Sequence, residues 1–140
     1  MESNSGYPTK YKKNGTLVGE TKALSTNLLY YNGYRLAAEM GRILIKSNER
    51  LRTQSSNGGL SHQLIQDLDE KAEALKATIR KRFWLEDKGY YAYMEDEHDQ
   101  LVEQMEGLGE SLVLLSDDFE LSGHRRRSIL DHTPVTENGI

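Results

Sequence analysis

The chain has 140 residues, which suits a single domain. Its 18 basic and 22 acidic side chains give a formal net charge of −4, so the basic stripe that is typical of nucleic-acid binders is not expected. It contains no cysteine, which excludes disulfides, thiolate metal sites and a cysteine nucleophile. No apolar run approaches the ~20 residues that cross a bilayer, and residues 1–15 lack the apolar stretch of a signal peptide. We therefore expect no membrane partner and no export signal in this chain, and the compartment stays open.

The N-terminal part predicts a polar loop followed by a helix. Residues 1–22 are rich in glycine, lysine and asparagine, which is typical of a loop. Gly33 and Gly41 interrupt the helix that follows and weaken it by about 1 kcal/mol each relative to alanine, so a packed neighbour has to stabilise it. Glycine also lets another helix approach closely. The apolar residues of this helix recur at mostly helical spacing: Leu29, Leu36, Met40, Ile43 and Leu44.

A second helix is predicted over residues 61–82. The sequence "QSSNGG" at 54–59 marks a break before it. Its apolar positions form a narrow stripe, and the opposite side is charged. Together the two helices predict an αα-hairpin. The stripe consists of Leu64, Leu68, Ala72, Leu75 and Ile79.

After residue 82 the apolar period changes. The alternation around Tyr91 and Tyr93 predicts a short β-hairpin, in which Tyr90–Glu95 pairs with Gln100–Glu103. Residues 105–116 return to a helical pattern, and Phe119–Leu130 predicts a last helix. We expect Arg125–Arg127 near the C-terminal end of this helix, where positive charge suits the helix dipole.

Motifs for a metal or a phosphate group are absent from the sequence. The four histidines are scattered and lack the spacing of metal ligands, and "GLG" at 107–109 lacks the lysine and the length of a P-loop. The acidic stretch Glu95–Asp99 lacks the glycine and the spaced oxygen ligands of an EF-hand loop, so we interpret it as a solvated turn. The sequence predicts no metal and no cofactor.

Three stretches carry a family resemblance when they occur in this order: "KALSTNLLYYNGYRLAAEMGRIL", "LKATIRKRFWLEDKGYYAYM" and "VEQMEGLGESLVLLS", the last followed by "ILDHTPVTENGI". Residues 20–140 thereby resemble the six-hairpin, (α/α)6-barrel glycosidases, and are similar to bacterial glucosidase-like and glycogen-debranching-like proteins. The resemblance implies an all-α fold: αα-hairpins of an incomplete (α/α)6 barrel with a short β-hairpin insertion. The implied domain spans residues 23–140 and follows the polar loop of residues 1–22.

The implied activity is hydrolysis of O-glycosidic bonds in carbohydrates. Such enzymes place two carboxylic acids across the scissile bond, and the family motifs assign neither of them to a residue of this chain. Because six hairpins need several hundred residues, we expect a fragment that is inactive as an isolated chain and whose carbohydrate partner binds the full-length parent. The alternative is a self-contained small helical interaction or structural module.

Four residues are candidate substrate contacts. Glu103 and Glu106 share a face if both are helical, and they either contact sugar or are acids favoured by the helix dipole. Tyr91 and Tyr93 either stack on sugar rings or pack in the interior, and we expect Trp84 to belong to the core. Exposed apolar helix faces would also favour self-association.

Overall fold

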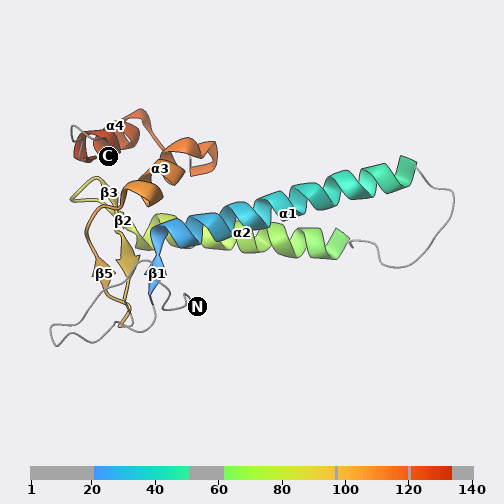
Figure 1. Cartoon of the computed structure of the whole chain (residues 1–140), viewed down its shortest axis with the longest axis horizontal. Helices are drawn as coiled ribbons and strands as arrows, with labels where there is room; N and C mark the ends of the chain where they lie inside the picture. Colours follow the sequence, from blue (N-terminus) through green and yellow to red (C-terminus); the bar gives the residue numbers. More distant parts are fainter. Residues whose placement is uncertain (1–20, 51–61, 97, 120, 134–140) are drawn as a thin grey trace. The chain divides into compact units, whose positions relative to one another are not determined.

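The computed structural model describes residues 21–50, 62–96, 98–119 and 121–133 (Figure 1). This part of the chain is mostly helical and carries small antiparallel strand pairs. Most of the predicted N-terminal loop, residues 1–22, lies outside it. The chain divides into two compact units, Leu29–Ala77 and the residues on either side of that range, and each unit is described here by itself.

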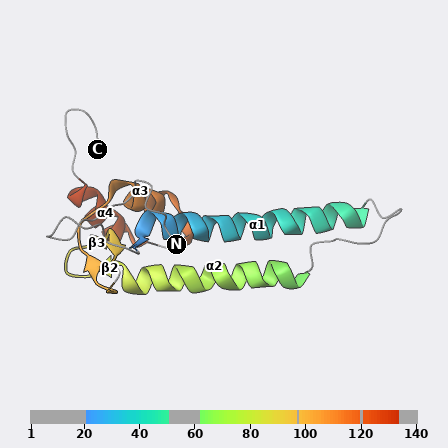
Figure 2. The same cartoon turned by 60° about the horizontal axis from the view of Figure 1, so that its bottom comes forward.

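The unit Leu29–Ala77 consists of two antiparallel helices. They belong to α1 (Leu24–Arg50) and α2 (His62–Arg82), which run side by side (Figures 1 and 2). An ion pair between Arg42 and Asp69 joins them. The predictions of both helices are confirmed. Few apolar side chains are buried among the described residues of this unit, and half of them are alanines: Tyr31, Ala38, Ile65 and Ala72.

The apolar residues that predicted α1 are not the residues that it buries. Leu36 and Met40 are 59% and 62% exposed, whereas Tyr31 and Ala38 are buried. A helix with apolar residues on two faces shows helical spacing on each, and the spacing alone does not reveal which face packs. The predicted apolar stripe of α2 agrees better with the observed burial than that of α1. Ala72 is buried, although Leu64 is 44% exposed.

The second unit contains two small antiparallel sheets. One has the strand order β1-β4-β5, from β1 (Lys22–Ala23), β4 (Met94–Glu95) and β5 (Leu101–Val102). The other pairs β2 (Trp84–Leu85) with β3 (Tyr90–Tyr91). The backbone N–H of Leu24 donates to the Tyr93 carbonyl at 2.9 Å, so the beginning of α1 is tied to the strands.

The predicted β-hairpin is confirmed in part. Met94–Glu95 pairs with Leu101–Val102 as expected. The other part of the prediction is wrong, because Tyr90–Tyr91 pairs with the preceding strand, Trp84–Leu85, and not with the strand that follows. Gly89 has a φ of 73°, a left-handed conformation that glycine adopts without cost, and its N–H donates to the Leu85 carbonyl at 2.8 Å. This turn reverses the chain before Tyr90.

Two further helices complete this unit, α3 (Gly107–Leu115) and α4 (Gly123–His132), with the 3₁₀ turn Asp117–Phe119 between them. The predicted helix over 105–116 is confirmed. The predicted helix over Phe119–Leu130 begins too early, because Ser122 caps α4 and accepts a bond from the Arg125 N–H at 3.2 Å. Arg125–Arg127 therefore lies in the N-terminal half of α4 and not near its end. Arg126 instead donates to the Leu114 carbonyl at 2.9 Å, at the C-terminal end of α3.

Gly109 allows α3 to pack closely on the first turn of α1. A Cβ at this position would lie 2.7 Å from Leu24 Cδ2 and 2.8 Å from Glu106 Oε2, both closer than ordinary contact. The interior of this unit is built from large apolar side chains, and the fully buried ones come from helices, strands and the 3₁₀ turn: Leu24, Leu28, Ile79, Tyr91, Met94, Val113, Phe119 and Ile129.

Candidate functional site

Three glutamates lie on the segment that leaves β5 and enters α3. Glu103 follows β5 directly and is exposed. Glu106 is the N-cap of α3, and its Oε2 accepts a bond from the Gly109 N–H at 3.1 Å. Glu110 lies in the first turn of α3, where negative charge is favoured by the helix dipole. The predicted pair Glu103 and Glu106 thus lies on one short segment with a third carboxyl group, but Glu103 lies outside α3 and Glu106 only caps it, so the two do not share a helix face.

Glu110 is the most deeply buried of the three glutamates. Only 2% of the Glu110 surface is exposed to solvent. Oε1 accepts a bond from the Tyr91 N–H at 2.6 Å, and Oε2 is buried without a hydrogen-bond partner in the described part of the chain. Burial raises the pKa of Glu110 to about 8; the Tyr91 N–H opposes this rise and the charge of Glu106 adds to it. Glu110 is therefore mostly protonated at neutral pH and is closed off from solvent.

Glu103 is held by an ion pair on the surface. Its Oε2 lies 2.7 Å from Lys88 Nζ. The hydrogen bond to Glu103 raises the pKa of Lys88, which keeps the ammonium group charged. The Tyr90 hydroxyl donates to the Glu103 backbone carbonyl at 3.2 Å. Glu103 is exposed to solvent, and its carboxylate is paired with Lys88, which lies in the turn that precedes β3.

The tyrosines named from the sequence differ in their surroundings. Tyr91 is 1% exposed, and its ring meets the Trp84 ring edge-on at 5.0 Å between centroids. Burial, with a smaller contribution from Glu110, raises the pKa of Tyr91 to about 12. A ring so enclosed offers no face to a sugar in this structure. Tyr93 is half-buried, and its N–H donates to the Val102 carbonyl at 3.0 Å.

Trp84 is half-buried at the edge of the same cluster. The Arg125 guanidinium lies over its ring, 4.5 Å from the centroid. Glu86 accepts from the Trp84 indole N–H at 2.5 Å and from Arg125 at 3.0 Å. The three side chains contact one another on the surface, and the Arg125 guanidinium covers one face of the Trp84 ring.

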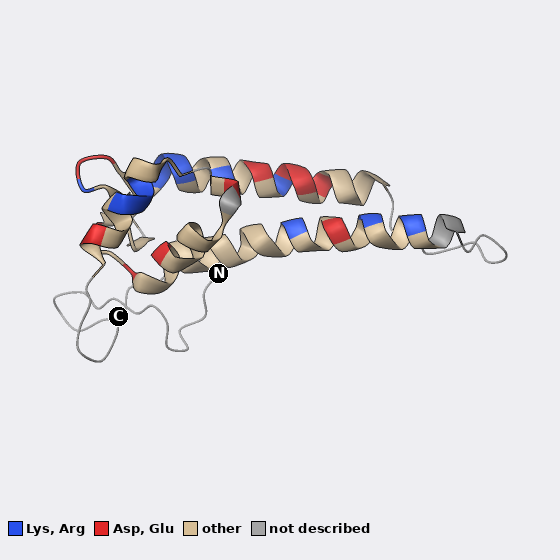
Figure 3. Cartoon of the chain, turned by 90° about the horizontal axis from the view of Figure 1, so that it is seen from above, with Lys and Arg blue, Asp and Glu red and all other residues tan. Residues whose placement is uncertain are grey.

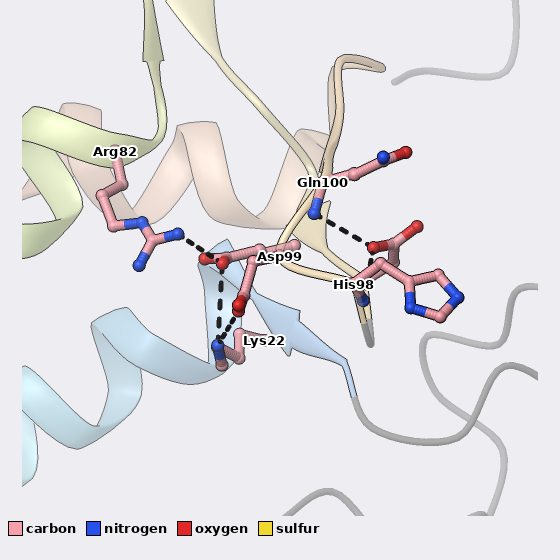
Figure 4. A network of polar contacts seen from close by, with 7 residues as sticks. Lys22, Arg82, His98, Asp99 and Gln100 are labelled. Carbon is pink, nitrogen blue, oxygen red and sulfur yellow. Dashed lines mark hydrogen bonds and ion pairs between the residues drawn. The ribbon is translucent and has the colours of Figure 1, made fainter.

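The residues of the acidic stretch Glu95–Asp99 do not form a simple solvated turn. Glu95 is 1% exposed and pairs with Arg82 at 2.5 Å and with Lys22 at 3.6 Å. Lys22 also pairs with Asp99 at 2.8 Å (Figure 4). The Asp96 carboxylate accepts from the backbone N–H groups that follow it, at 2.9 and 3.0 Å. Among the described residues of the stretch, His98 and Asp99 are exposed, as predicted for a solvated turn.

The sequence pattern gave no signal for the Glu95 network and only one for the burial of Glu110. Glu95 and Arg82 are 13 positions apart, and Tyr91 and Glu110 are 19 apart, so no local spacing brings either pair together. A single hint exists for Glu110: it belongs to the apolar run 108–115, where a charged residue is unusual.

The part of the chain that the structure describes has neither a metal-binding cluster nor a membrane-spanning helix. No group of three or more histidine, aspartate or glutamate side chains there could hold a metal ion. None of its helices combines the length and the apolar character that crossing a bilayer requires.

The chain was compared with known protein families, with curated proteins and with solved structures. No family model, curated protein or solved structure matches it.

Proposed function

We propose that this chain is part of a glycoside hydrolase of the six-hairpin type, and that it contributes scaffold beside the sugar site and not the catalytic pair. Two features support the proposal. The first is the sequence resemblance over residues 20–140. The second is the pair of long antiparallel helices followed by short strands and further helices, an order compatible with hairpins of a larger helical barrel.

The bonding of the three glutamates is the observation that carries the scaffold role. A glycosidase needs two carboxyl groups facing a sugar from opposite sides, about 5–9.5 Å apart according to mechanism. Glu106 caps α3, and Glu103 is paired with Lys88. Glu110 is buried and accepts a hydrogen bond from the Tyr91 N–H. All three lie on one segment and each is bonded within the chain. The catalytic carboxyl groups of the parent are therefore proposed to lie outside this segment.

A helical interaction module is the second candidate function. The observation that favours it is the exposed apolar face of α1, where Leu29, Leu36 and Met40 are each more than half exposed. Exposed apolar surface of this kind marks sites of protein association.

The first experiment is an activity assay of the purified chain on a panel of aryl-glycosides and oligosaccharides. We expect no turnover above the uncatalysed rate, because positioning of both carboxyl groups supplies much of the catalytic power. Glu103→Gln and Glu106→Gln are the matched variants. Robust turnover that either substitution abolishes would overturn the scaffold role and make that residue catalytic.

The second experiment separates the two candidate functions. The genomic DNA on both sides of the coding sequence is read for in-frame sequence that encodes further helical hairpins. If they are present, the longer protein is expressed and assayed on the same panel, and we expect it to hydrolyse at least one substrate. A start and a stop at the ends of this chain, with no coding similarity beyond them, would favour the interaction module.

A further inference from the structure

An unpartnered apolar face runs along α1 within the unit Leu29–Ala77. Its residues are here called the α1 stripe, and all but the last follow one another at spacings of three or four positions, which places them on one face of the helix. The five large side chains are between 47% and 62% exposed. Tyr31 and Ala38, which α1 buries, lie on another face. The α1 stripe consists of Leu29, Gly33, Leu36, Met40, Ile43 and Leu44.

The α1 stripe carries no charge. The described charged residues of α1 lie on the remaining circumference, and Figure 3 shows them as isolated coloured positions on a helix that is mostly tan. Arg42 is one of these, and it is paired with Asp69 of α2. A second copy of this face could therefore approach without burying a charge or opposing like charges. The charged residues are Arg35, Glu39, Arg42 and Lys46.

The described residues of the chain give no packing reason for a glycine at position 33. A Cβ added there would meet nothing within 4 Å. A glycine inside a helix destabilises it by about 1 kcal/mol relative to alanine, and no contact within the described residues requires one here. Close approach of another helix is a physical reason for a glycine on an exposed apolar face.

We infer that the α1 stripe is the contact between two copies of this chain, with the two α1 helices antiparallel about a two-fold axis. The axis passes between Leu36 and Ala37. Met40 of one copy then lies over Gly33 of the other, and Leu29 faces Leu44. A two-fold interface uses the same patch on both copies, and this register places large side chains against small ones at its centre.

The area agrees with a weak dimer. Complete burial of the exposed parts of the five large side chains of the α1 stripe on two copies removes on the order of 1,000 Å², which lies in the range of weak and transient interfaces. We therefore expect dissociation in the micromolar range. The inference goes beyond the proposed function and fails separately from it, because its readout is association and not hydrolysis.

The experiment is sedimentation equilibrium of the full chain over a wide range of concentration. We expect a monomer–dimer equilibrium. Leu36→Glu and Met40→Glu should each weaken the dimer at least a hundredfold, with unchanged far-ultraviolet circular dichroism, because both positions are exposed in the monomer. The matched control is Leu130→Glu on α4, which makes the same change at a leucine that is 56% exposed, against 59% for Leu36. This control should leave the dimer unchanged.

Gly33→Ala gives a second readout of opposite sign. The added methyl group should stabilise the helix of the monomer, because it meets no described atom of the chain within 4 Å. It should weaken the dimer about tenfold, because it fills the space over which Met40 of the other copy lies. A purely structural role for Gly33 would not separate these two effects.

The absence of cysteine makes the orientation testable. Chains carrying Leu29→Cys are mixed with chains carrying Leu44→Cys under mild oxidation. The antiparallel register predicts mixed disulfides in preference to disulfides between identical chains. Preferential like-with-like disulfides would overturn the register. A monomer at all concentrations, larger assemblies, or a dimer that Leu36→Glu leaves intact would overturn the inference.

Discussion

Glu110 shows how a single side chain can make the stability of a small protein depend on pH. The fold encloses its carboxyl group, gives one oxygen a backbone donor and leaves the other without a partner in the described residues. Such an environment disfavours the charged form, which costs desolvation energy. The fold therefore binds a proton at Glu110 that the unfolded chain releases.

The sign of the resulting pH dependence follows from linkage. The pKa of Glu110 rises from 4.5 to about 8 on folding, so the stabilisation is fully present below about pH 4.5 and is lost as the pH rises through about 8. We expect the free energy of unfolding to fall by about 3 kcal/mol between pH 5 and pH 8 on account of this group. Urea unfolding at a series of pH values measures this change.

Glu110→Gln is the variant that isolates the effect. Glutamine is neutral and retains an oxygen that can accept the Tyr91 N–H, so the variant should be more stable than the natural chain at pH 8 and should lose most of the pH dependence. Glu103→Gln, at an exposed and ion-paired glutamate, should retain it. An unchanged slope in Glu110→Gln would show that other groups produce the dependence.

Gly109 is a second residue at which a small change affects the packing, because an added Cβ atom would be too close to its neighbours. Gly109→Ala would place a methyl group within 2.9 Å of Leu24 and Glu106, so Leu24 or the N-cap has to move. We expect a net loss of about 1–2 kcal/mol, although alanine favours helix. Thermal or urea unfolding measures it. Gly123→Ala is the control in the same unit, because its Cβ meets nothing within 4 Å, and it should be neutral or stabilising.

At the scale of elements, the Glu95 network connects α2, β1 and β4. Glu95 is buried, and Arg82 is its nearest cation. Arg82→Met should cost about 2 kcal/mol: removal of one partner from a buried pair costs more than this, but Arg82 is itself half-exposed and Lys22 remains at 3.6 Å. Urea unfolding of the two single variants and of the double variant gives the coupling energy.

The double variant distinguishes a network from a surface contact. We expect Arg82→Met with Glu95→Met to cost less than the sum of the single changes, since no buried carboxylate is left without its cation. Lys81→Met, at an exposed neighbour on α2, should change stability by less than about 0.5 kcal/mol. Additive single changes would show that Arg82 and Glu95 act independently.

At the scale of the whole molecule, the two units differ in how much apolar surface they bury. The unit Leu29–Ala77 buries only one aromatic, one isoleucine and two alanine side chains among its described residues. The other unit buries many large apolar side chains from helices and strands. Low burial permits local opening at low free energy. The long helices are therefore expected to be stable at one end and weak at the other.

Hydrogen exchange measures this difference. Amides of Ile79–Phe83 at the end of α2 should exchange more slowly than amides of His62–Ala72 in the same helix, by a factor of at least a hundred. The measurement is made on Leu36→Glu, so that association does not protect α1. Uniform protection along α2 would contradict the expectation and would show that the helix opens as one unit.

The sequence by itself determined the helices and little of what they contact. The 3.6-residue spacing of apolar residues identified α1, α2 and α3, because this period is a local property of the chain. The turn around Asp96–Asp99 and the pairing of Met94–Glu95 with Leu101–Val102 were likewise predicted from residues close together in sequence. Glu103 and Glu106 lie close together for the same reason, since only three positions separate them.

The tertiary structure decided which faces are buried and what the carboxyl groups do. Two faces of α1 have helical apolar spacing, and only packing shows that the α1 stripe is the exposed one. Glu110 is bonded to Tyr91, which is 19 positions away in the sequence. Glu95 is paired with Arg82, which is 13 positions away. Contacts over such separations depend on chain reversals, such as the one at Gly89, that no local period encodes.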